Sequence, residues 1–125
     1  MALIVQKYGG TSVADCARIE HVADKVLASH RAGHEVVVVL SAMSGETDRL
    51  LGLGKSISAR PSARELDVLL ATGEQVTIAL LAIALEKRGC KARSFTGGQV
   101  RILTDSTHSK ARILAIDDGK IRAAL

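Results

Sequence analysis

Aromatic residues are almost missing from this sequence of 125 residues, which contains one Phe, one Tyr and no Trp. Proteins that bind single-stranded nucleic acid stack the bases on aromatic side chains, so a site of that kind is excluded. The core must instead be built from aliphatic residues, within a hydrophobic content of 47%. A charged content of 24% is that of an ordinary folded domain, and the length corresponds to one such domain.

Basic clusters, long apolar runs and paired cysteines are also lacking. The net charge is +4, but Lys and Arg occur singly, which argues against a nucleic-acid surface. The longest near-apolar stretch, Val76 to Leu85, is too short to cross a bilayer, and the apolar start Ala2 to Val5 is too short for a signal-peptide core. Cys16 and Cys90 have neither disulfide-framework nor zinc-motif spacing. We therefore expect a cytoplasmic protein without nucleic-acid or membrane partners.

The spacing of apolar residues predicts an α/β fold. Ala2 to Lys7 is a β-rich run that stops at Gly9-Gly10, and apolar residues then recur at helical spacing until Gly33, a plausible helix stop. The next run, Val36 to Leu40, is continuously apolar, as is typical of a parallel strand covered on both faces. These three elements predict a βαβ unit.

Helix signals continue after this unit. Ser12 with Asp15, and Thr72 with Gln75, have the spacing of capping boxes, which would begin two helices. The helix after Glu74 is apolar on every side, as expected in the middle of a protein. The predicted elements are helices over 46–58 and 62–88, the second interrupted at 72–73, strands over 91–95 and 112–116, and a last helix from about 117.

Three loops rich in glycine and hydroxyl groups, 7–12, 41–45 and 96–98, follow predicted strands. Ligands of open α/β sheets bind beyond the carboxyl ends of the strands, where backbone N–H groups and helix N-termini receive anions. Lys7 stands where its ammonium could reach a phosphate held on the amides of Gly9 and Gly10. Taken by themselves, the two glycines are explained by an ordinary tight turn. The whole segment 7–12, placed directly after a strand, favours phosphoryl-transfer chemistry.

A carboxylate, Glu74, begins the apolar helix and has two explanations. Burying it without a partner is costly, so a bound ammonium group would explain it; favourable placement in a first helical turn explains it equally well. Thr47, Asp48 and Arg49 could contact a substrate or merely cap and solvate their helix. The pair His30 and His34 has no third ligand, so no metal site is predicted.

Three segments, Lys7 to Val13, Ser41 to Asp48 and Ala71 to Gln75, resemble the motifs of the aspartokinase family in order and spacing. The resemblance continues through 95–99 and 113–125, so it covers essentially the whole chain. It implies the amino-acid kinase fold, a three-layer α/β/α sandwich with a mainly parallel central sheet, here truncated. Acetylglutamate and uridylate kinases share this fold and a glycine loop, but the second and third motifs favour aspartokinase.

The resemblance implies transfer of the γ-phosphoryl group of ATP, with Mg²⁺, to the side-chain carboxylate of L-aspartate. This is the first step toward lysine, threonine and methionine. Lys7 would be catalytic by stabilising charge on the phosphoryl group, and Thr47 and Glu74 would hold aspartate, with Glu74 facing its amino group. Because a truncated sheet leaves apolar strands uncovered, we also expect self-association into a homo-oligomer. The residues implied to bind ATP are Lys7, Tyr8, Gly9, Gly10, Thr11, Ser12 and Ser41.

The chain departs from the family pattern mainly in extent. Tyr8 stands where many members have Phe, and Gly98 where many have Ala. The family's kinase domain continues through a nucleotide-binding half with an Asp that acts in transfer, and regulatory ACT domains follow. We therefore expect residues 1–125 to be the amino-terminal portion of the catalytic domain, with little turnover alone. The alternative is a non-catalytic anion-binding module, or an interaction domain that uses an exposed apolar sheet edge.

Overall fold

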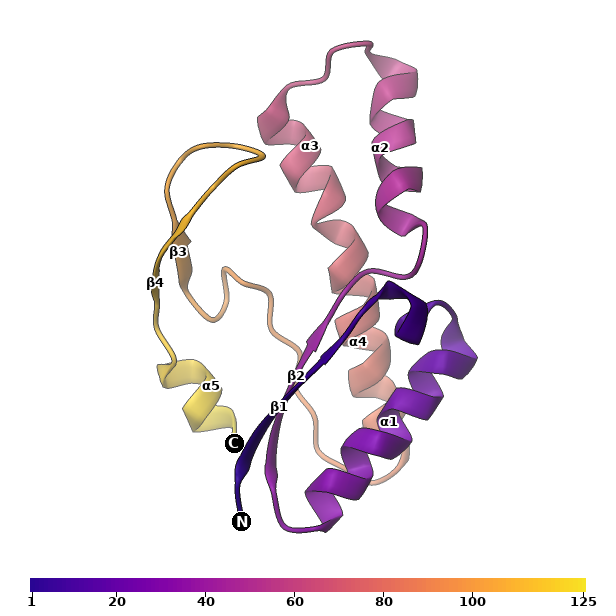
Figure 1. The fold of residues 1–125 in the computed structure, drawn as a ribbon, viewed down its shortest axis with the longest axis vertical. Coiled ribbons are helices and arrows are strands. Elements are labelled where there is room, and N and C mark those ends of the chain that lie inside the picture. Colours follow the sequence, from indigo (N-terminus) through magenta and orange to yellow (C-terminus); the bar gives the residue numbers. More distant parts are fainter.

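The computed structural model describes all residues from 1 to 125 and begins with the predicted βαβ unit (Figure 1). Strands β1 (Leu3–Tyr8) and β2 (Glu35–Leu40) pair in parallel, in a register that places Leu3 opposite Glu35 and Tyr8 opposite Leu40. Helix α1 (Cys16–Arg31) connects them and ends before Gly33, whose φ of +90° is readily adopted only by glycine.

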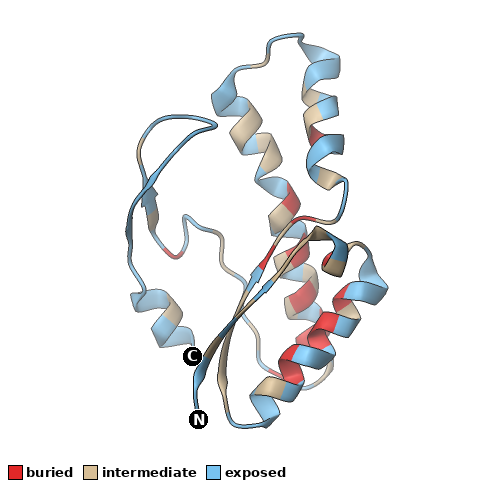
Figure 2. Cartoon of the chain, in the orientation of Figure 1, coloured by how far each residue is buried: buried red, intermediate tan, exposed pale blue.

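Helices α1 and α4 (Thr72–Lys87) pack together on one face of this sheet. Side chains alternate along a strand, so Ile4, Gln6 and Tyr8 share the face that the helices cover. Between this face and the two helices lies one cluster of buried, mostly aliphatic residues, which come from both helices, from the turn before α1 and from the end of β2 (Figure 2). The largest contributors are Val13, Ile19, Val22, Val26, Leu27, Leu40, Leu81 and Leu85.

The opposite face of the sheet is open, which corrects the prediction that β2 is covered on both faces. Val39 of β2 is 47% exposed and Val5 of β1 is 64% exposed, because no helix of this chain crosses that side. Helix α4 is likewise buried along one side only, since Val76 and Ile83 face outward. The chain thus supplies the sheet and one helical layer of the predicted three-layer fold.

Helices α2 (Glu46–Ile57) and α3 (Ala63–Leu70) lie side by side and form an arm that extends from the first turn of α4 (Figure 1). Both capping-box predictions are wrong. Asp15, not Ser12, caps α1 by accepting a hydrogen bond from the Arg18 N–H at 2.8 Å. The Thr72 hydroxyl donates to the Leu69 carbonyl instead of capping α4, because α3 and α4 follow each other with only Ala71 between them.

The predicted strand over 91–95 does not form, because none of its backbone groups pairs with a neighbouring strand. A separate antiparallel pair, β3 (Ile102–Thr104) with β4 (Ile113–Ile116), contains the predicted fourth strand outside the parallel sheet. Its tip contacts α3, where the Asp67 carboxylate accepts a hydrogen bond from the Ser109 N–H at 2.8 Å. The last helix is α5 (Gly119–Ala124).

Ion pairs join the ends of the two core helices. The Arg88 guanidinium, at the end of α4, lies 2.9 Å from the Asp24 carboxylate and 2.5 Å from the Glu20 carboxylate of α1. Hydrogen bonds from Arg88 and Lys87 hold the pKa of Glu20 below its ordinary value. These contacts fix how far α4 lies along α1, and so where the first turn of α4 meets the sheet.

The run Ala63–Lys87 has the length and hydropathy of a membrane-spanning helix. Core helices of soluble proteins pass the same test, and one side of α4 packs against α1. The run also carries Arg64, Glu65 and Asp67 in its first turns. Its composition is therefore explained by the core that it helps to build.

Candidate functional site

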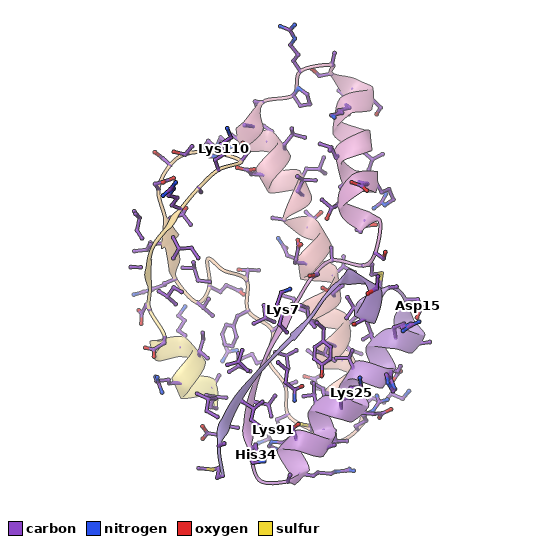
Figure 3. The ribbon with its side chains drawn as sticks, viewed as in Figure 1. Lys7, Asp15, Lys25, His34, Lys91 and Lys110 are labelled. Carbon is purple, nitrogen blue, oxygen red and sulfur yellow. The ribbon has the colours of Figure 1, made fainter.

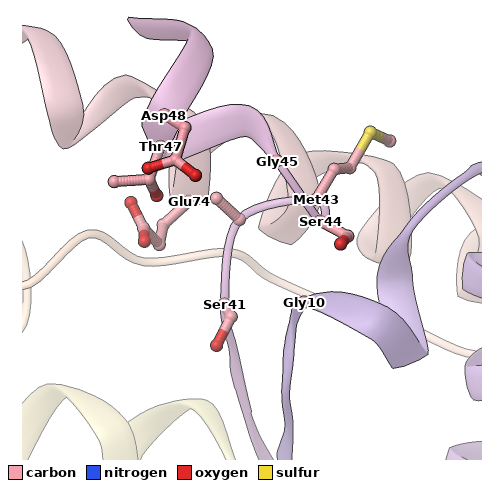
Figure 4. A pocket seen from close by; sticks show the side chains of 9 residues that line it. Gly10, Ser41, Met43, Ser44, Gly45, Thr47, Asp48 and Glu74 are labelled. Atoms are coloured by element: carbon pink, nitrogen blue, oxygen red, sulfur yellow. The ribbon is translucent and has the colours of Figure 1, made fainter. Parts of the chain in front are cut away.

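A cavity of about 280 Å³ lies beyond the carboxyl ends of β1 and β2, where the sequence predicted a ligand (Figure 4). It is formed by the turn after β1, the loop between β2 and α2, and the first turns of α2 and α4. Of the residues predicted for the site, it brings together Gly10, Ser41, Thr47 and Glu74. The full lining is Gly10, Ser41, Ala42, Met43, Ser44, Gly45, Thr47, Asp48 and Glu74.

Backbone contacts hold the two loops of the cavity together. The Ser41 N–H donates to the Tyr8 carbonyl at 3.1 Å, which extends the pairing of the strands by one residue. The Ser44 N–H donates to the Gly10 carbonyl at 3.2 Å. A Cβ atom at Gly10 would stand 3.0 Å from the Ala42 carbonyl oxygen, so glycine permits the close approach of the loops.

One end of this cavity is acidic. Glu74 is half-buried at the first turn of α4, and neither it nor Asp48 is engaged by a cation of the protein. The nearby Arg49 is already paired with Glu46 at 2.6 Å, and this hydrogen bond lowers the pKa of Glu46. Two free carboxylates with no basic lining residue favour a ligand that carries an ammonium group.

Lys7 and Ser41 lie on the same side of the sheet. Side chains alternate between the two faces along a strand, so the Lys7 side chain lies on the face opposite to that of Tyr8. It therefore projects from the open face of β1, near the carboxyl end of the strand (Figure 3). Ser41 follows the buried Leu40 and takes the same open side. Lys7 does not line the cavity itself; it pairs with Val39 of β2, two residues before Ser41, which does line it.

The glycine loop forms a short 3₁₀ turn, Gly10–Val13, in which the Ser12 N–H donates to the Gly9 carbonyl at 3.0 Å. The first N–H groups of such a turn have no partner inside it and can receive an anion. The N-terminus of α1, which is the positive end of its helix dipole, is already occupied by the Asp15 carboxylate. The N–H groups that this loop leaves open to an anion are therefore those of the turn and not those of α1.

Three predicted features lie away from the cavity. The Tyr8 ring faces the helices, where its hydroxyl donates to Gln6 at 2.8 Å and burial raises its pKa, so only its backbone reaches the loop. Thr11 is exposed on the 3₁₀ turn. The third glycine loop, 96–98, folds on itself through hydrogen bonds between Thr96 and Gln99 and lines no part of the cavity.

Gly73, interpreted from the sequence as a helix interruption and as part of the third motif, makes a close contact in the structure. A Cβ atom there would lie 2.9 Å from the Ala42 Cβ and 3.6 Å from the Glu46 Cγ. Only glycine lets the first turn of α4 approach the loop after β2 so closely. Gly73 therefore sets the position of its neighbour Glu74 in the cavity.

Alanine substitutions at two helical glycines test this close approach. Gly52→Ala, in α2, meets nothing within 4 Å and should stabilise the chain by about 0.5–1 kcal/mol. Gly73→Ala gains the same helix propensity but overpacks the contact with Ala42, at a cost of about 1–3 kcal/mol. Urea unfolding should find Gly73→Ala clearly less stable than Gly52→Ala. Equal stabilities of the two variants would mean that Ala42 moves aside freely.

Comparisons with known proteins show the family to which the chain belongs. The model of the amino acid kinase family matches residues 2–125. An aspartate kinase of Pseudomonas putida is 67% identical over 125 residues, which are all of this chain and 30% of that protein. An aspartokinase of Geobacillus stearothermophilus is 54% identical over 125 residues, or 31% of that protein. The chain thus spans about 30% of the length of these curated relatives.

The fold is similar to that of a solved structure as well. The crystal structure of aspartate kinase from Synechocystis matches with a TM-score of 0.75 and 49% identity. The match covers 78% of this chain and 17% of that chain. It confirms the predicted fold class, a truncated α/β fold of the amino-acid kinase type, and the predicted resemblance along the chain.

Proposed function

Because this chain belongs to the amino acid kinase family, we propose that it carries the aspartate site and the phosphate loop of an aspartate kinase. The reaction moves the γ-phosphoryl group of ATP to the side-chain carboxylate of L-aspartate, forming 4-phospho-L-aspartate and ADP. The observation that carries the proposal is the cavity that joins Ser41, Thr47 and Glu74 beside Lys7. Residues 1–125 would be the amino-terminal portion of the catalytic domain.

In this proposal the two ends of the cavity hold the two substrates. Glu74, with Asp48 beside it, receives the ammonium group of aspartate, and the Thr47 hydroxyl binds one of its carboxylates. The N–H groups of Gly10 and Thr11 and the Ser41 hydroxyl face the phosphate side. The attacking carboxylate oxygen and the γ-phosphorus then meet near Ser41.

Lys7 supplies the charge that this transfer needs. Negative charge spreads over the phosphoryl oxygens as the bond from the γ-phosphorus to the bridging oxygen of ADP breaks. A fixed ammonium group at the carboxyl end of β1 stabilises that charge more in the transition state than in the bound substrates. Lys7 is the one cation that the strand places beside Ser41 on the open face of the sheet.

The family chemistry also implies Mg²⁺ with ATP. No group of three or more His, Cys, Asp or Glu side chains comes together in this structure, so the chain offers no metal cage of its own. Kinases bind Mg²⁺ largely through substrate phosphates and one or two carboxylates. In this proposal the residues of the chain bind the substrates, and Mg²⁺ arrives with ATP as part of the co-substrate.

We also propose that the protein is cytoplasmic and a homo-oligomer. Support for self-association comes from the open sheet face, on which Leu3, Val5 and Val39 are each about half exposed or more. The same face supports a second candidate function, a non-catalytic interaction module. Titration of the chain with L-aspartate separates the two, because a module of that kind has no need of the acidic cavity.

A chimera tests the proposed activity directly. The chain replaces the matching 125 residues of the Pseudomonas putida aspartate kinase, and hydroxylamine traps the acyl phosphate as aspartyl hydroxamate. We expect ATP-dependent hydroxamate formation with L-aspartate and little with N-acetyl-L-aspartate, which lacks the ammonium group. A well-folded chimera that forms no hydroxamate would contradict the proposal. The chain alone should show little or no turnover.

A further inference from the structure

Thr77 is the one polar residue that is buried in the core, and the proposed reaction leaves it without a role. Its side chain is 0% exposed, on an otherwise apolar stretch of α4. Buried hydroxyl groups need hydrogen-bond partners, so the choice of partner indicates what the group does. Here both partners are backbone carbonyls of residues that line the cavity.

The Thr77 hydroxyl reaches across from α4 to the end of β2. Its Oγ1 lies 2.9 Å from the Ser41 carbonyl oxygen and 3.1 Å from the Glu74 carbonyl oxygen, one turn earlier in the same helix. The Ser41 carbonyl accepts no backbone N–H, so this hydroxyl is its hydrogen-bond donor. Ser41 is thus held by β1 through its N–H and by α4 through its carbonyl.

We propose that Thr77 is a positioning residue that sets the spacing between the phosphate side and the aspartate side of the site. The proposal rests on the proposed function, because Ser41 and Glu74 then face different substrates. The hydroxyl has one proton, which the two carbonyl oxygens share, and the bond to the Ser41 carbonyl is the one that joins two elements. Losing the hydroxyl therefore frees the end of β2 from α4. Small errors in the alignment of two reactants slow their reaction more than they weaken the binding of either one.

The test compares substitutions at two threonines of the same helix in the chimeric kinase. Thr77→Val keeps the shape and removes the hydroxyl; we expect kcat to fall about tenfold, with both KM values within about threefold. Thr77→Ser restores the hydroxyl and should restore kcat. Thr72→Val is the matched control, because the Thr72 hydroxyl also bonds a carbonyl three residues earlier, that of Leu69 in α3, but reaches neither β2 nor a residue that lines the cavity.

The outcomes separate this proposal from its premise. A parent chimera that makes no aspartyl hydroxamate overturns the proposed function and this proposal together. With an active parent, an unchanged kcat for Thr77→Val, or a Thr77→Ser variant as slow as Thr77→Val, overturns the positioning role alone. Should Thr77→Val fail to fold, Thr77→Cys takes its place, since a thiol is a weak donor. An unchanged kcat for that variant overturns the role as well.

Discussion

Replacement of Lys7 by Met in the chimeric kinase is expected to lower kcat about 100- to 1,000-fold, the size of effect seen when one group that stabilises transition-state charge is removed. Met keeps the length and the apolar stem of the side chain, so the sheet should fold as before. Lys7 projects from the open face of β1 and makes no ion pair, so its loss breaks no contact of the fold. Hydroxamate formation at saturating substrates measures the effect.

Lys25→Met is the control for Lys7→Met. Lys25 is an exposed residue of α1, on the other side of the sheet from Lys7, and its replacement by Met removes the same charge from the protein. The kcat of the Lys25→Met chimera should equal that of the parent chimera. The KM for L-aspartate should stay within about threefold in both variants, because Lys7 acts on the phosphoryl group and not on the amino acid. A Lys7→Met chimera with parental kcat would remove Lys7 from the mechanism.

Glu74→Gln should raise the KM for L-aspartate about 30-fold or more, which corresponds to about 2 kcal/mol for a half-buried charge pair that loses one partner. The amide keeps the shape of the carboxylate but turns donors toward the substrate ammonium group. Asp48 remains in the cavity and limits the loss. Because the ammonium group is bound equally in the ground and transition states, kcat should change little.

The same helix provides a control for Glu74→Gln. Glu86 is an exposed carboxylate near the end of α4, remote from the cavity, and its side chain forms no ion pair. Glu86→Gln should leave the KM for L-aspartate at the parental value. The assignment of Glu74 to the ammonium group is untenable if both variants have the same KM, or if Glu74→Gln lowers kcat alone.

Local patterns were sufficient for the elements that are stabilised by near neighbours. The βαβ unit follows from a β-rich run, a helical repeat that ends at Gly33 and the apolar run of β2. The break between α3 and α4 was placed within one residue. These features depend on side-chain periodicity and on backbone preferences, which neighbouring residues in the chain largely determine.

Elements whose partners are distant in the sequence were predicted less well. The segment 91–95 has the composition of a strand but no paired neighbour, and β4 pairs with β3 instead of the parallel sheet. The capping-box spacing at Ser12 was outweighed by Asp15, because a 3₁₀ turn intervenes before α1. Composition cannot say which backbone groups meet, since pairing depends on the positions of other elements.

The sequence by itself determined the family, which is carried by motifs in a fixed order, and from the same motifs it predicted residues for the phosphate loop and the aspartate site. Only the tertiary structure decided which of those side chains meet. Lys7 and the Tyr8 ring lie on opposite faces of one sheet. At Gly73 the absence of a side chain lets α4 approach the loop after β2, and the Thr77 hydroxyl bonds the end of β2. Contacts of this kind join residues more than 30 positions apart, and no local pattern encodes a distance across the fold.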